Sequence, residues 1–378
     1  MLPMKTTLQK LFAVGLFTFI LSLIALLSSA QPHDVQTFTT SGSWVCPYGV
    51  TSITVETWGG GGAGGAAFNG SPVGGGGGGG SYKITTLVSV TFGTTYNYVV
   101  GAGGLGNNTG AGATGIASSF NGLHTANPGA GGTSDGSIAV SGTGGIGGTH
   151  SGGNGGIGTV TTPVSGGGGG GAGSTGSGGN GGTPTAGTGG ASNGGAGGLG
   201  VTAEGDGIDG ITIGGGGSGA LKTKNGNGTF KGGNGARGQV RITYTINCTA
   251  PPAQPTGLVL SPGSNGISGS FTSAAHTDGY IVIRTSTAAA PTSPVNGTTY
   301  TAGTFALGGF VESVGTPTTF NSTSLAATTQ YWYWVYGYDN VACAGGIQYL
   351  IISPLTGNST TIICGSSTNT ATVTSTAG

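Results

Sequence analysis

The chain has 378 residues, of which 90 are glycine, and its nine basic and nine acidic residues give a formal net charge of zero. Glycine is therefore more than three times as frequent as the roughly 7% of an average chain. Partners such as nucleic acid or an anionic membrane surface require a basic patch, and the composition argues against both. The four histidines lack metal-ligand spacing and no serine lies in a nucleophile elbow, which indicates a non-enzymatic protein.

Residues 1–30 have the order of a secretory signal peptide. Lys5 and Lys10 make the first ten residues basic, and an apolar run follows over 11–27. Ser28-Ser29-Ala30 then offers a small-residue cleavage site. We predict cleavage after Ala30 and a secreted protein, in the extracellular space or on the cell surface. A retained N-terminal anchor is the alternative, because the apolar run is nearly long enough to span a bilayer. No later segment is apolar enough for a membrane span in the mature chain.

The remaining chain divides into a glycine-rich module over 31–246, a β-rich module over 247–362, and residues 363–378, a linker or the start of a further module. Runs rich in β-branched and aromatic residues predict strands in the first module. They cover residues 50–58, 81–92, 95–100 and 238–244. Glycine tracts lie between the third and the last of these runs, so we expect them to be insertions in a small β-framework of an all-β protein.

The glycine tracts have a period of three. Gly-Gly-X triplets recur at 144–148, 152–157, 178–182, 194–199 and 232–235. A polyproline II type helix has three residues per turn and no internal hydrogen bonds, so neighbouring helices of this type can bond to one another. We therefore expect packed polyglycine-II-like helices. Flexible coil is the alternative, because ordering glycine costs more conformational entropy than ordering any other residue. Apolar residues at X positions, namely Ile146, Ile157, Ala196 and Leu199, favour order.

Both ends of the glycine-rich module are distinctive. Residues 38–65 read FTTSGSWVCPYGVTSITVETWGGGGAGG, and residues 232–245 read GGNGARGQVRITYT. These stretches resemble the glycine-rich domain of exported Bacteroidota proteins and of phage tail adhesins. The resemblance implies a small β-structure that carries packed polyglycine helices, with loops that meet a partner. It implies no catalytic residues.

The second module resembles a fibronectin type III domain. The resemblance rests on residues 255–258, 267–271 and 278–284, and on Leu325 six residues before Tyr331, which is similar to the tyrosine corner of that family. It implies a β-sandwich. Phe271 stands where the family usually has tryptophan, so we expect a repacked core.

An aromatic strand over 331–338 has two faces, because strand side chains alternate. The resemblance assigns one face to the core, namely Tyr331, Tyr333, Val335 and Gly337. The other face carries four aromatic residues, namely Trp332, Trp334, Tyr336 and Tyr338. They form a candidate stripe for stacking on sugars or on a protein. The alternative is that neighbouring strands or the glycine-rich module cover them.

Four cysteines fit an oxidising compartment. Cys248 and Cys343 fall at one pole of the sandwich that the resemblance implies, so we predict a disulfide between them. Such a bridge closes a loop of about 95 residues and stabilises by up to roughly 4 kcal/mol in the chain-entropy model. The pairing of Cys46 and Cys364 stays open.

One acidic cluster lies within the glycine tracts. It comprises Glu204, Asp206 and Asp209, separated by glycines and Ile208. Carboxylates at this spacing could supply oxygen ligands to Ca²⁺, although the EF-hand spacing is absent. A solvated loop is the alternative, and no other cofactor is expected.

Together these features predict a non-enzymatic cell-surface or extracellular structural and adhesion protein, whose glycine-rich module is a rigid display or recognition element. Its partner would be a surface glycan or a protein receptor. The alternative is a carbohydrate-binding accessory region of a longer secreted hydrolase.

Overall fold

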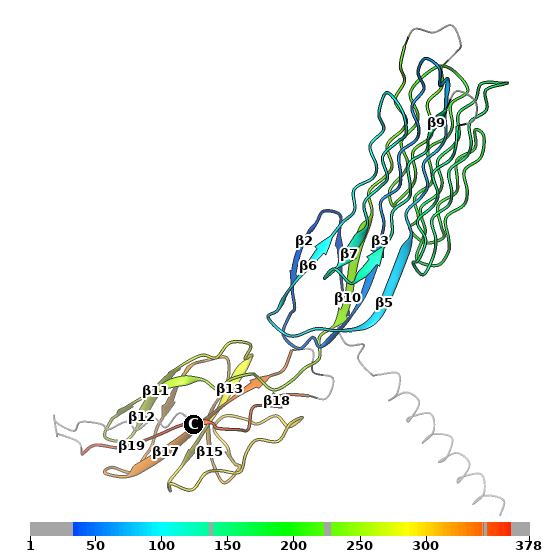
Figure 1. The fold of residues 1–378 in the computed structure, drawn as a ribbon. Coiled ribbons are helices and arrows are strands. Elements are labelled where there is room, and N and C mark those ends of the chain that lie inside the picture. Colours follow the sequence, from blue (N-terminus) through cyan, green and yellow to red (C-terminus); the bar gives the residue numbers. More distant parts are fainter. Residues whose placement is uncertain (1–32, 136–138, 223–227, 342, 344–345, 364–378) are drawn as a thin grey trace, which may run out of the picture. The chain divides into compact units, whose positions relative to one another are not determined.

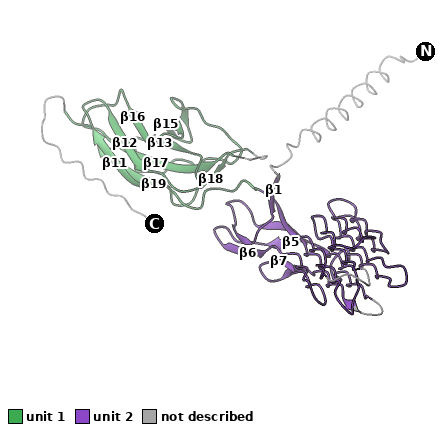
Figure 2. Cartoon of the chain, turned by 90° about the horizontal axis from the view of Figure 1, so that it is seen from above, with its two compact units in different colours: residues 1–32, 246–378 green, residues 33–245 purple. Residues whose placement is uncertain are grey.

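The computed structural model describes residues 33–135, 139–222, 228–341, 343 and 346–363. These residues form two compact units, which divide between Thr245 and Ile246 (Figure 2). The described residues contain strands and no α-helix, so the all-β prediction is confirmed, and none of their elements is a helix that could cross a membrane. The predicted signal peptide and Cys364 lie outside the described residues.

The first unit is built on two antiparallel sheets. One has the strand order β1-β10-β3-β5, with bounds His33–Phe38, Gln239–Thr245, Ser52–Trp58 and Tyr82–Ser89. The other has the order β2-β6-β7-β8, with bounds Gly42–Val45, Thr95–Val99, Ser118–Phe120 and His124–Ala126. The four strands predicted in this unit are therefore confirmed as β3, β5, β6 and β10, and a short pair, β4 (Val73–Gly74) with β9 (Ser134–Asp135), completes its strands among the described residues.

This framework has an apolar core and an ion pair whose carboxylate is buried. Alternate residues of β10 are buried, as the pleat of a strand requires, and Trp44 packs on the ring of Tyr244. The carboxylate of Glu56 is buried and accepts two hydrogen bonds from Arg241, each 2.6 Å long, and one from the hydroxyl of Tyr82 at 2.7 Å. The buried charge is therefore satisfied from neighbouring strands.

Glycine segments run side by side from the framework to a set of distal turns (Figure 1). The segment 74–80 hydrogen-bonds through its backbone to six others, namely 59–66, 127–134, 139–146, 151–158, 165–173 and 213–221. The N–H groups of three successive glycines, beginning at Gly75, donate to the carbonyl groups of Thr133, Gly156 and Gly217 in turn. The N–H groups of the next three glycines donate to the same three segments in the same order. The tracts are thus packed, as expected. No helix is assigned to them, so their polyglycine-II-like conformation stays a prediction.

Many glycines in the interior of this lattice have no room for a side chain. A Cβ atom at Gly78 would lie 2.1 Å from the carbonyl oxygen of Thr143, and one at Gly64 would lie 1.8 Å from that of Ser218. Both distances are far below van der Waals contact, so glycine is required at these positions by the close approach of neighbouring backbones.

The second unit is a β-sandwich. Its smaller sheet has the order β11-β12-β16, with bounds Thr256–Pro262, Ile267–Thr272 and Thr319–Ser322. Its larger sheet has the order β14-β15-β13-β17-β18, with β19 also paired to β17. The bounds of these strands are Phe305–Ala306, Gly309–Gly315, Gly279–Thr285, Gln330–Asp339, Gln348–Tyr349 and Leu355–Thr360.

The core between these sheets holds the residues that the sequence assigns to it. Tyr331, Tyr333 and Val335 are buried there, so the predicted inner face of the aromatic strand is confirmed. The backbone N–H of Ala326 donates to the hydroxyl of Tyr331 at 3.1 Å, which is the contact of a tyrosine corner. Phe271 packs edge-on against Tyr280, with ring centroids 4.9 Å apart, so the core is filled without a tryptophan at that position.

Candidate functional site

The outer face of β17 is largely covered. Trp334, Tyr336 and Tyr338 are only 6%, 2% and 8% exposed. The prediction of an exposed stripe of four aromatic residues is therefore wrong for these three. They belong to a second apolar cluster of the sandwich, together with Ile281 and Ile283 of the neighbouring strand β13.

The cover is the long connection between β13 and β14, residues 286–304. Within it, the N–H of Gly297 donates to the carbonyl of Ile347 at 2.8 Å, and Asn296 accepts the N–H of Tyr349 at 2.8 Å. The ring of Tyr300 packs on that of Tyr349, with centroids 6.0 Å apart. Because these contacts fix the connection on the sheet, the aromatic face is covered over most of its length, as the alternative expects, but the cover is this connection, which the alternative did not name.

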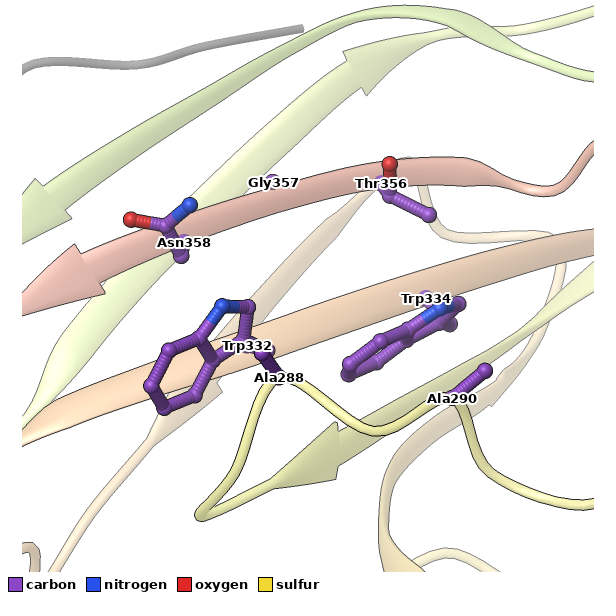
Figure 3. Close-up of a pocket in the computed structure, with 7 residues that line it drawn as sticks. All are labelled: Ala288, Ala290, Trp332, Trp334, Thr356, Gly357 and Asn358. Carbon is purple, nitrogen blue, oxygen red and sulfur yellow. The ribbon is translucent and has the colours of Figure 1, made fainter. Parts of the chain in front are cut away.

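Trp332 differs from its three neighbours. Its side chain is half-buried and, with Trp334, lines a hollow of about 350 Å³ (Figure 3). Cross-strand pairing sets Asn358 of β19 directly beside Trp332, and Thr356 directly beside Trp334. Two indoles on one strand and two polar side chains on the next therefore share one face of the sheet.

Small residues close the rest of this hollow. Ala288 and Ala290 come from the covering connection, and Gly357 lies between the two polar residues of β19. The amide nitrogen of Gln330 donates to Oδ1 of Asn358 at 2.8 Å, which holds that amide beside the indole of Trp332. None of the seven lining residues is charged.

The predicted disulfide between Cys248 and Cys343 is present, with Cα atoms 4.9 Å apart and a sequence separation of 95. Cys46 is a buried free thiol, 3.4 Å from the carbonyl oxygen of Val50, and burial raises the pKa of this thiol. Its pairing with Cys364 lies outside the described residues.

Two carboxyl groups meet beside this disulfide. Asp278 accepts the backbone N–H groups of Asn340 and Val341, both at 2.7 Å, and it shares a side-chain hydrogen bond with Asp339. Burial and that shared hydrogen bond raise the pKa of Asp339 to about 6. Burial acts to raise the pKa of the Asp278 carboxyl. Hydrogen bonds from Asp339 and the two N–H groups outweigh burial, so the pKa of Asp278 is lowered. Asp339 is therefore the group that holds the proton in mild acid.

The acidic cluster of the glycine tracts has a structural role. Asp206 accepts the backbone N–H of Lys231 at 2.7 Å, and Asp209 accepts that of Asn234 at 2.6 Å. The structure does not gather these carboxylates with Glu204. The one cluster of three metal-binding side chains found in the described part of the chain is Cys248, Asp339 and Cys343, where the sulfurs are bonded to each other. The two aspartates thus satisfy outward backbone donors at the edge of the lattice.

Asparagines in the Gly-Gly-Asn triplets act in the same way. Oδ1 of Asn154 accepts the N–H of Gly144 at 2.8 Å, and Oδ1 of Asn180 accepts the N–H of Asn154 at 2.8 Å. By contrast, Ile146 and Ile157 are 71% and 51% exposed, so apolar X residues do not hold the lattice together. Order arises instead from backbone hydrogen bonds, and at the edge of the lattice side-chain oxygens accept the backbone N–H groups that would otherwise lack an acceptor. The three-residue spacing of Asp206 and Asp209 is the signal that the sequence offered for this role.

Comparison with solved structures finds distant likenesses to fibronectin type III and related domains. The fibronectin type III domain of human fibronectin type III domain containing protein 3 is 17% identical, covers 32% of this chain and 96% of its own, and has a TM-score of 0.19. Domains A168–A170 of titin are 14% identical, cover 36% of this chain and 43% of theirs, and have a TM-score of 0.20. No curated protein matches the chain.

A family model gives the broader match. Residues 36–245 match the model described as glycine-rich domain, and these residues are more than half of the chain. The match begins in β1 and ends at the last residue of β10, so it includes the framework and the lattice. The chain belongs to the glycine-rich domain family.

Proposed function

We propose that this chain is a non-enzymatic cell-surface or extracellular adhesion protein whose glycine-rich unit is a rigid support for recognition loops. The observation that carries the proposal is the bonding of segment 74–80 to six neighbouring segments. A segment fixed on every side cannot act as a flexible spacer. The predicted signal peptide and the resemblance to exported Bacteroidota and phage-adhesin modules support export and adhesion.

The repeat of the hydrogen bonds supports polyglycine-II-like helices as the basis of this rigidity. Gly75 and Gly78 donate to residues 133 and 130 of one neighbour, and Gly76 and Gly79 donate to residues 156 and 153 of another. Donors three residues apart thus return to the same neighbour, as a helix with three residues per turn requires. The chain turns at the ends of such segments are the elements free to vary and to meet a partner.

Hydrogen exchange on the mature chain, read by mass spectrometry, tests the rigid support. We expect strong protection of peptides over 74–80 and 213–221, because their N–H groups are bonded and buried. Turn residues 107–109 and 161–162 are exposed and serve as the internal control. Exchange of the two interior segments at the rate of the turns would overturn the proposal.

A second assay tests adhesion itself. Beads coated with the mature chain are placed on a panel of cultured cells and on glycan-coated glass, and their retention under flow is measured. Retention should fall when the exposed turn 161–162 is replaced by Gly-Ser or the turn 107–109 by Gly-Ser-Gly, while lattice protection in hydrogen exchange is unchanged. If coated and bare beads are retained equally on every surface, the chain has no adhesive role there and the adhesion proposal fails.

A further inference from the structure

The hollow between Trp332 and the covering connection is a place where the outer face of the sandwich opens to solvent. Tyr336 and Tyr338, farther along the same strand, are sealed beneath that connection. We infer that this hollow is a binding site for one or two rings of a neutral sugar. The inference does not depend on the function of the glycine-rich unit.

The indoles supply the first half of the recognition. A pyranose ring has an apolar face of C–H groups, and it stacks favourably on an aromatic face that retains exposure to solvent. Trp332 is half-buried while Trp334 is 6% exposed, so the first offers a free surface and the second forms the back wall (Figure 3). Their two-residue spacing places both side chains on one face of β17.

The neighbouring strand supplies the second half. The rim of a sugar ring is a row of hydroxyl groups, which both donate and accept hydrogen bonds. The amide of Asn358 and the hydroxyl of Thr356 lie beside the two indoles in direct cross-strand register. These side chains provide donors and acceptors at the edge of an apolar surface, which is the usual composition of a small-molecule site.

Charge and size restrict the class of ligand. An acidic sugar would need a cationic partner, and none of the seven lining residues is charged. A volume of about 350 Å³ is at the small end of ligand-binding pockets. Ala288 and Ala290 leave this space open, because any larger side chain at either position would occupy it.

Titration of the mature chain with neutral trisaccharides tests the site. The probes are maltotriose, cellotriose, mannotriose and chitotriose, with trigalacturonate as the charged control, read by tryptophan fluorescence and calorimetry. We expect saturable binding of at least one neutral probe with a Kd of about 1 mM or tighter, as suits a ligand of this size. Trigalacturonate should not bind.

Variants assign the binding to the hollow. Trp332→Ala and Asn358→Ala should each weaken binding, the first by roughly tenfold or more because the stacking surface is lost. Ala290→Phe fills the hollow without removing an indole, and it should also abolish binding. Phe305→Ala is the matched control, because Phe305 is an aromatic residue of the same unit that is 81% exposed and does not line the hollow. Thermal melting of each variant verifies folding.

Three results would overturn the inference. The first is that no neutral probe binds at about 10 mM, well above the expected dissociation constant. The second is binding that survives both Trp332→Ala and Ala290→Phe in folded protein. The third is binding of trigalacturonate as tight as that of the neutral probes, which would show that the site does not select an uncharged ring.

Discussion

Single glycines in the lattice differ sharply in what they tolerate. A Cβ atom at Gly78 would lie 2.1 Å from the carbonyl oxygen of Thr143 and 2.4 Å from its carbonyl carbon. At Gly205 no heavy atom lies within 4 Å of the position of a Cβ atom, and its φ is not in the left-handed region. The two positions are therefore a matched pair for substitution: both are glycine, but only Gly205 has room for a Cβ atom.

Gly78→Ala should lower the free energy of unfolding of the first unit by about 3 kcal/mol or more, because backbone atoms of a neighbouring segment must move to admit the methyl group. Gly205→Ala should change it by at most about 1 kcal/mol, with stabilisation expected from the lower entropy of the unfolded chain. Urea denaturation followed by circular dichroism measures both. Equal effects of the two changes would contradict the close packing of the interior.

Among the elements, β17 ends at Asp339, whose hydrogen bond to Asp278 depends on a proton held between the two carboxyl groups. The pKa of Asp339 is about 6 in the folded state, against 3.8 for the free residue, so the folded state binds more protons between these values. The contribution of Asp339 to stability therefore falls as pH rises from about 4 to about 6. Asp278 has a lowered pKa, and its contribution is lost only at more acidic pH.

Asp339→Asn should stabilise the second unit near pH 7, because an amide keeps the donor to Asp278 without a second negative charge. The gain over wild type should shrink as pH falls toward about 4, where Asp339 itself is protonated. Chemical denaturation at several pH values measures this difference. Asp278→Asn is the control and should destabilise at neutral pH, since Asp278 accepts two backbone N–H groups. A gain for Asp339→Asn that is independent of pH would contradict the assignment.

The sequence predicts elements that have strong local patterns. β10 alternates valine, isoleucine and tyrosine with polar residues, and β17 alternates two sets of aromatic residues, so both strands could be recognised. β1 and β2 are only six and four residues long, and only pairing with β10 and β6 gives them their structure. They could not be recognised, because the determining contacts are 50 or more residues away in the sequence.

The candidate site was predictable only in part. The period of two placed Trp332 and Trp334 on a common outer face. That the connection 286–304 covers this face could not be predicted, because its alanine, threonine and proline residues show no periodicity. Ala288 and Ala290 leave a hollow through their small size, and Asn358 enters it through the register of β19 with β17. Both features depend on tertiary packing.

At the scale of the whole chain, the two units are stabilised by different interactions. The sandwich buries side chains such as Leu258, Ile267 and Tyr333 in a conventional apolar core. The lattice buries glycine backbone, for example at Gly76 and Gly216, whose N–H groups donate hydrogen bonds of 2.9 and 2.8 Å to neighbouring segments. Unfolding the lattice therefore exposes mainly peptide groups, and unfolding the sandwich exposes mainly apolar surface.

Calorimetry of the mature chain should reveal this contrast. Exposure of apolar surface raises the heat capacity and exposure of polar surface lowers it, with a net increase of about 12–15 cal/mol/K per residue for ordinary domains. The transition of the glycine-rich unit should therefore have a heat-capacity increase per residue well below that range, while the sandwich should fall within it. Disruption of the disulfide by reduction shifts the sandwich transition and identifies it. An ordinary heat-capacity increase for both units would contradict a lattice held mainly by backbone hydrogen bonds.

The pairing of β1 with β10 determines how the first unit would respond to tension. His33 at the start of the unit lies opposite Thr245 at its end, in an antiparallel register. A force that pulls these two ends apart acts on that pair first and then on one further pair at a time toward Phe38, as in the opening of a zipper. The glycine segments lie between the two strands in the sequence. The force is therefore transmitted through the hydrogen bonds between β1 and β10, and not through the glycine segments, until β1 has separated. Under tension this unit would therefore extend first by the detachment of β1, while the glycine lattice carries no force and stays folded.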